Sequence, residues 1–163
     1  MFDPTTLLGF HTIVSLIALG TGILAVLALL GLRLPVVWTQ LFLLTAVVAS
    51  ATGFLFPVAT VLPSHIIGAI ALVVLAAVLL ARFVGPFAGV WRWVYAGGIV
   101  ASLYFLFFVA IAQAFSKVPV LKAAAPTLSE PPFAISQGIN LVIFIGLGIA
   151  ALRLFRYRGA SIA

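Results

Sequence analysis

The sequence lacks cysteine and is poor in charge. Without cysteine the chain has no disulfide, no thiolate ligand, no c-type haem attachment and no iron–sulfur site of its own. Charged residues make up 6% of the 163 residues, whereas hydrophobic residues make up 66%. A soluble fold needs more polar surface than this to be solvated. The composition therefore predicts an integral membrane protein.

Polar and apolar residues do not alternate along the apolar runs, which excludes barrel strands and leaves helices. A helix needs about 20 apolar residues to cross the hydrocarbon core. We therefore predict an all-α integral membrane bundle, a single transmembrane domain over residues 1–163 with five transmembrane helices. The spans are expected at about 4–32, 36–56, 63–84, 93–115 and 134–157, with a periplasmic loop at 116–133.

The first apolar run has no positively charged region before it and is long enough to span the membrane. We therefore expect a membrane helix here and not a cleaved signal peptide. Asp3 is a suitable N-cap, and Pro4 suits the first helical position, where its missing N–H costs nothing. A rival count has four spans, with this run lying in the membrane interface.

The charged residues separate by side in a five-span topology. One side carries Arg33, Arg82, Arg92, Arg153, Arg156 and Arg158. The other carries Lys117 and Lys122 together with both acids, Asp3 and Glu130. The positive-inside rule then places the N-terminus in the periplasm and the C-terminus in the cytoplasm. Because the basic residues lie at the ends of apolar runs, they indicate topology and not nucleic-acid binding.

Small residues four positions apart mark the faces through which the helices are expected to pack. Such pairs are Ala18 and Gly22, Ala49 and Gly53, Gly98 and Ser102, and Gly146 and Ala150. They let backbones approach closely in a membrane, where no hydrophobic drive acts between helices. We predict that each pair packs against a neighbouring span.

Polar side chains gather at one level of the predicted bundle. The only histidines, His11 and His65, lie in the periplasmic half of their spans, as do Gln113, Gln137 and Asn140. Polar groups in hydrocarbon are costly and usually mark a binding site or a buried network. We predict a polar pocket in the periplasmic leaflet, lined by these five residues.

One interpretation of this pocket is a b-type haem between spans one and three. Neutral imidazoles are the ligating form, so His11 and His65 would bind the haem iron from opposite faces. Gly68 and Ala69 would make room for the macrocycle, and a lysine of the 116–133 loop would meet the propionates.

Three other interpretations stay open beside the haem. A quinone or another amphipathic ligand would bond to His11, His65 or Gln113 and stack on Tyr104 or a nearby phenylalanine. A metal ion would need both histidines and Glu130 as ligands. In the last interpretation His11 and His65 only form hydrogen bonds across helices, to Gln113, Gln137, Asn140 or backbone groups.

Several chemistries lack the residues that they require. No lysine lies within a span, which excludes a retinal Schiff base, and no acid does, which argues against a carboxylate proton relay. The chain has no P-loop, zinc-protease motif or serine nucleophile elbow. The small number of helices and the lack of an inverted repeat argue against a self-contained secondary transporter. We do not expect an enzyme.

Six stretches carry a resemblance to known proteins: Thr52–Pro57, Pro63–Gly68, Ala81–Arg82, Trp91–Tyr95, Gln113–Pro119 and Ala125–Phe133. In them the chain resembles a family of small bacterial multi-pass inner-membrane proteins, over nearly its whole length. The resemblance implies a bacterial inner membrane and brings no activity and no functional residue. Members of that family often carry an asparagine in the tract that reads Tyr104–Phe108 here, a departure that argues against a polar site at that depth of span four.

Two classes of function fit these expectations. One is a redox-linked module that holds haem b or a quinone in the polar pocket. The other is a non-catalytic accessory or structural subunit of a larger membrane complex. In both, the chain contacts the lipid bilayer, and a membrane-protein partner or a second copy would cover its packing faces.

Overall fold

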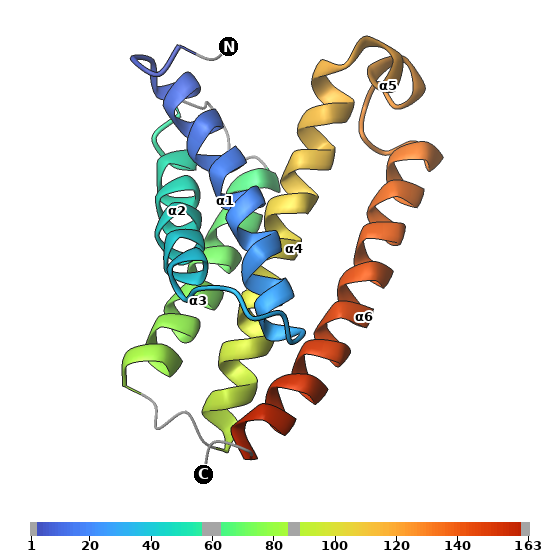
Figure 1. Ribbon diagram of the computed structural model, residues 1–163. Coiled ribbons are helices and arrows are strands. Elements are labelled where there is room, and N and C mark those ends of the chain that lie inside the picture. Colours follow the sequence, from blue (N-terminus) through green and yellow to red (C-terminus); the bar gives the residue numbers. More distant parts are fainter. Residues whose placement is uncertain (1–2, 57–62, 85–88, 161–163) are drawn as a thin grey trace.

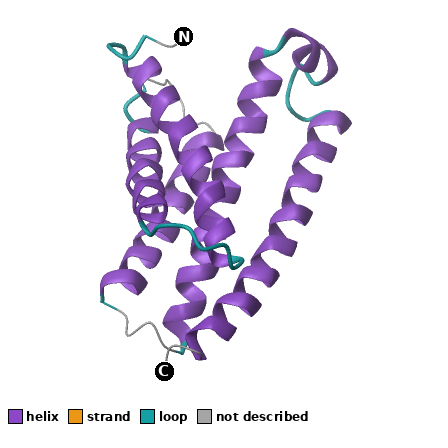
Figure 2. Cartoon of the chain, viewed as in Figure 1, coloured by secondary structure: helices purple, strands orange, loops and turns teal. Residues whose placement is uncertain are grey.

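The structure is all-helical wherever it is described. This computed structural model describes residues 3–56, 63–84 and 89–160, and these contain no strand (Figure 1). Figure 2 shows the same chain coloured by secondary structure. The helices are α1 (Leu7–Leu29), α2 (Val37–Gly53), α3 (Pro63–Phe83), α4 (Val90–Lys117), α5 (Pro119–Ala124) and α6 (Pro131–Ala160). The predicted all-α class is confirmed.

Four of these helices, α1, α3, α4 and α6, are long and apolar enough to cross a membrane. Helix α2 is also apolar, but its 17 residues extend only roughly 26 Å at ~1.5 Å per residue. Large apolar side chains such as Leu44, Val73 and Val142 are exposed on the outside of the bundle. In a chain of this composition such faces indicate contact with lipid, as in a multi-pass membrane protein.

Helix α4 lies at the centre of the arrangement. It packs against α1, α3, α5 and α6, while α2 packs against both α1 and α3. Figure 1 shows α1 and α2 as an antiparallel hairpin, with α6 running beside α4 on the outside of the bundle. Helix α6 has few direct contacts with α1. This unequal packing of α6 determines where the bundle is hollow.

Glycines allow the central helices to approach closely. A Cβ atom at Gly22 would lie 2.6 Å from Leu103 Cδ1 of α4 and 2.7 Å from Phe42 Cε2 of α2. A Cβ at Gly98 would overlap the Val78 side chain of α3. The small residues predicted to pack on the first and fourth spans therefore do so, because larger ones would not fit.

The small pair on the last span behaves differently. In the described part of the chain, no atom lies within 4 Å of a Cβ built at Gly146. The prediction that Gly146 and Ala150 pack against another span of the chain is wrong at Gly146. Helix α6 instead turns a different face toward the core, the face with Phe144 and Ala151.

Helix α1 begins later than the sequence predicts. Its N-cap is Thr6, whose Oγ1 accepts a hydrogen bond of 3.1 Å from Gly9 N. The prediction of Asp3 as N-cap is wrong, because the Asp3 carboxylate accepts from Thr5 N and Thr5 Oγ1 instead. These local bonds form a turn before the helix, which is a common alternative for short polar side chains.

The connection between α4 and α6 is more ordered than a simple loop. It contains α5, and the rings of Phe115 and Phe133 meet edge to face at 5.5 Å where α4 ends and α6 begins. Just before α6, the Glu130 carboxylate accepts hydrogen bonds from Thr127 N, Thr127 Oγ1 and Ser129 N. The carboxylate thus closes the turn that leads into α6.

We expect this turn to be sensitive to acid, because its hydrogen bonds depend on the ionised Glu130 carboxylate. Partial burial raises the pKa, but the hydrogen bonds from the Thr127 side chain and from backbone N–H groups lower it more, so it lies below the ordinary value. The ionised carboxylate therefore stabilises the turn at pH values above the pKa of Glu130 in the unfolded chain, about 4.3. This stabilisation is lost as the pH falls through the lower pKa of the folded protein.

We therefore expect Glu130→Gln to reduce the amide-exchange protection of Thr127 and Ser129 at pH 7, measured by NMR. The difference from the unchanged protein should vanish at acid pH, where Glu130 is protonated. Lys122→Gln alters a charge in the same connection and serves as the control. Equal protection in both proteins at pH 7 would contradict this role of the carboxylate.

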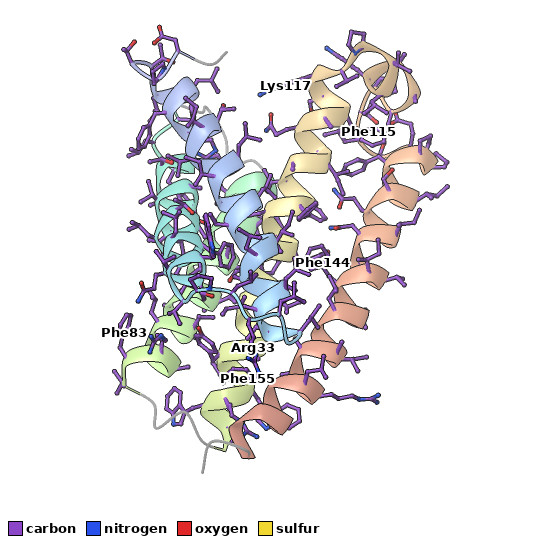
Figure 3. All side chains as sticks on the ribbon, in the orientation of Figure 1. Arg33, Phe83, Phe115, Lys117, Phe144 and Phe155 are labelled. Carbon is purple, nitrogen blue, oxygen red and sulfur yellow. The ribbon has the colours of Figure 1, made fainter. Side chains whose placement is uncertain are left out.

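The charged residues lie at the two ends of the bundle. Arg33 follows α1, Arg82 and Arg153 lie near the ends of α3 and α6, and Arg92 lies at the start of α4. Because neighbouring helices alternate in direction, these positions share one end, and Figure 3 shows Arg33 on the opposite side from Lys117. The charge separation expected from the sequence is present among the described residues. The side chains of Arg156 and Arg158 lie outside what the structure describes.

Candidate functional site

His11 connects α1 to α2. Its Nδ1 lies 2.9 Å from Thr52 Oγ1. The Thr52 hydroxyl itself donates to Val48 O at 2.8 Å, so its oxygen is free to accept from the imidazole. With the Thr52 hydroxyl proton directed to Val48 O, the contact corresponds to a neutral imidazole that carries its proton on Nδ1 and not on Nε2. This bond fixes the hairpin of α1 and α2.

The two histidines contact different phenylalanines at the end of α2. The His11 ring meets Phe56 edge to face at 5.2 Å, and the His65 ring meets Phe54 at 5.6 Å. The Phe54 ring also occupies the space beside Gly68, since a Cβ there would lie 3.3 Å from Phe54 Cε2. Phe54 thus packs against α3 at Gly68, where the sequence predicted room for a haem macrocycle.

The set of metal ligands that the sequence suggested is not brought together. Across residues 3–56, 63–84 and 89–160, no three histidine, aspartate or glutamate side chains lie close enough to hold a metal ion. The prediction of His11, His65 and Glu130 as one set is wrong, because Glu130 is bound within the turn before α6.

The three amide side chains of the predicted pocket are not all brought together either. Gln113 is exposed, whereas Gln137 and Asn140 face the inside of the bundle from α6. Gln137 Nε2 donates to Phe108 O of α4 at 3.0 Å, which leaves the buried Oε1 without a partner among the described residues. Asn140 is only 6% exposed, and its Nδ2 also has no partner there. A buried amide donor without an acceptor is costly.

Asn140 forms part of the wall of a cavity. This cavity has a volume of about 370 Å³ and lies between α1, α4 and α6, where α6 has few direct contacts with α1. Its lining is Ile23, Val26, Leu27 and Leu30 of α1, Leu103, Phe107 and Ile111 of α4, and Ser136, Ile139, Asn140, Ile143, Phe144 and Leu147 of α6. Figure 3 shows Phe144 on the side of α6 that faces the other helices. The volume is within the range of small-molecule sites.

The polar and aromatic groups of this cavity are few and well defined. Ser136 Oγ donates to Pro132 O in its own helix at 2.8 Å, so its hydroxyl proton is already used. Among the described lining residues, Asn140 is thus the one whose side-chain donor, Nδ2, has no partner. The rings of Phe107 and Phe144 lie 5.5 Å apart and give the cavity an aromatic wall. Tyr104, the stacking partner expected from the sequence, packs against Phe144 and does not line the cavity.

The five predicted site residues therefore do not form one pocket. His11 precedes Ile23, the first α1 residue of the cavity wall, by 12 positions, or roughly 18 Å along the helix. Asn140 is the member of the predicted set that lines the cavity, and Gln137 lies one turn before it. The apolar wall residues of α1 and α4 carry no signal in the sequence, because lipid-facing and cavity-facing positions use the same residue types.

Comparison of the chain with known proteins found no match. No protein-family model matches the chain, and neither a curated protein nor a solved structure matches it. The candidate site is therefore defined by its own residues, as a mostly apolar cavity with one unsatisfied amide donor at Asn140.

Proposed function

We propose that the protein is a redox-linked membrane module that binds a quinone between α1, α4 and α6. The observation that carries the proposal is the buried Asn140. Its Nδ2 has no acceptor among the described residues, and the residue lines a cavity of about 370 Å³. A ligand carbonyl oxygen at this position would satisfy the amide and recover the cost of burying it.

The rest of the lining supports a flat, neutral ligand. None of the described residues that line the cavity is charged, so an anionic or cationic head group would be buried there without compensation. Phe107 and Phe144 supply aromatic surfaces against which a ring can pack. A quinone combines the two features that the wall requires, a planar ring and carbonyl acceptors.

The packing at the end of α2 favours a quinone over a b-type haem. The Phe54 ring packs against Gly68, the residue that was expected to make room for a haem held by both histidines. Each imidazole packs edge to face on its own phenylalanine, His11 on Phe56 and His65 on Phe54. In this proposal the histidines stabilise helix packing and do not ligate a metal.

The proposed topology has five spans in a bacterial inner membrane, with α2 as the shortest. A helix of 17 residues is at the lower limit for crossing the hydrocarbon core. The arginines at one end of the bundle support a cytoplasmic C-terminus and a periplasmic N-terminus. The resemblance to small bacterial inner-membrane proteins agrees with this location.

The absence of cysteine makes this topology directly testable. We expect single cysteines in place of Leu55 and Val120 to react with an impermeant maleimide in intact cells, whereas Leu32→Cys should react only after lysis. All three positions are exposed, so local burial does not bias the comparison. Equal labelling of Leu32→Cys and Leu55→Cys in intact cells would show that α2 does not cross the membrane.

Quinone binding is tested with the purified full-length protein. It should bind decylubiquinone saturably, with bound and micellar quinone separated by size exclusion and quantified by mass spectrometry. The affinity of Asn140→Leu should fall, whereas Ser136→Ala should bind normally because the Ser136 hydroxyl already bonds within its helix. A lack of saturable binding, or unchanged binding by Asn140→Leu, would overturn the proposal.

A further inference from the structure

We infer that the quinone tail leaves the cavity sideways, through the seam between α1 and α6, so that the site takes a lipid quinone directly from the bilayer. This seam is formed by Ile23 of α1 with Ile139 and Ile143 of α6. The inference rests on the proposed quinone site, and it specifies the class of quinone and its route of entry.

The exposure of the lining residues locates the opening of the cavity. Ile23, Ile139 and Ile143 line it and are 43%, 57% and 53% exposed, respectively. On the opposite wall, Leu103 and Asn140 are buried. A cavity with a buried back and an exposed rim on two neighbouring helices opens on the side of the bundle.

The rim lies within the lengths of α1 and α6 and not at their ends. Ile23 belongs to the last third of α1, and Ile143 lies near the middle of α6. In a bundle that crosses a membrane, an opening at this height meets hydrocarbon and not water. A water-soluble quinone would have to enter the bilayer first, whereas a lipid quinone is already there.

The shape of the cavity suits a head group with an attached chain. Along α6 the lining extends from Ser136 to Leu147, roughly 16 Å at ~1.5 Å per residue. Its polar residues, Ser136 and Asn140, lie at one end of this length, and the remainder is apolar. A quinone ring placed at Asn140 therefore leaves an apolar path for the quinone tail, along Ile143 to the rim.

The seam is open because α6 is attached to α4 rather than to α1. The rings of Phe115 and Phe133 join α4 and α6 at one end, and those of Tyr95 and Phe155 lie 5.8 Å apart toward the other. Helix α1 meets α6 at few positions. Both ends of α6 are thus held while its middle borders the cavity.

The test compares a quinone with a tail and one without. We expect Ile143→Trp, which places a bulky ring on the rim, to weaken decylubiquinone binding about tenfold, equivalent to the loss of about two buried methylene groups. Binding of the tailless 2,3-dimethoxy-5-methyl-1,4-benzoquinone should change less than about twofold. Ile145→Trp is the matched control, since Ile145 is also 53% exposed on α6 but does not line the cavity.

A second rim variant, Ile23→Trp, tests the seam from α1 and should reproduce the selective loss. Equal weakening of both quinones by the rim variants, or no weakening of either, would overturn the tail route while leaving the site intact. Failure of Asn140→Leu to affect either quinone would overturn the site itself. The two failures are therefore distinguishable.

Discussion

Asn140→Leu is expected to weaken quinone binding by roughly five- to tenfold and at the same time to stabilise the protein by about 1 kcal/mol. Leucine is close to asparagine in shape but has no hydrogen-bonding group. The substitution removes the donor that we assign to the quinone carbonyl. It also removes the cost of burying an amide that has no acceptor among the described residues.

The opposite signs of these two effects make the prediction specific. Stability is measured by unfolding in mixed detergent micelles without ligand, and affinity by the decylubiquinone titration. Gln137→Leu provides a contrast, because it deletes the bond to Phe108 O that links α6 to α4 and should destabilise the protein. A loss of stability in Asn140→Leu would mean that its amide has a structural partner and is not reserved for a ligand.

Gly22→Val is expected to destabilise the bundle by about 1–3 kcal/mol, the usual cost of overpacking a close-packed core. The added carbons would enter the junction of α1, α2 and α4, where Phe42 and Leu103 already lie within 3 Å of a Cβ position. Both side chains are almost completely buried, so neither can move aside into solvent. The helices would have to separate.

Gly20→Val is the matched control for this effect. It makes the same change on the same helix, at a position where the described residues place no atom within 4 Å of a Cβ. Helix propensity and loss of glycine flexibility are therefore equal in the two variants, and only packing differs. Equal midpoints of unfolding for the two variants would contradict the close contact at Gly22.

Local signals in the sequence are sufficient to predict the class of the protein and the positions of its long helices. The apolar runs correspond to α1, α2, α3, α4 and α6, because a helix in hydrocarbon must satisfy its own backbone and needs a fixed length of apolar residues. The ends are less well predicted. Helix α1 begins at Leu7 and not near Pro4, since Asp3 bonds to Thr5 and Thr6 serves as the cap.

The residue pattern also shows which residues are polar within apolar runs, but not which of them lie together. That Phe54 packs against Gly68, and that α6 packs on α4 and leaves a cavity beside Asn140, depends on the three-dimensional arrangement of the helices. The physical reason is that packing between apolar helices depends on shape over the whole surface. Because residues facing lipid, a neighbour or a cavity are of the same types, no local pattern specifies the order of helices around the bundle.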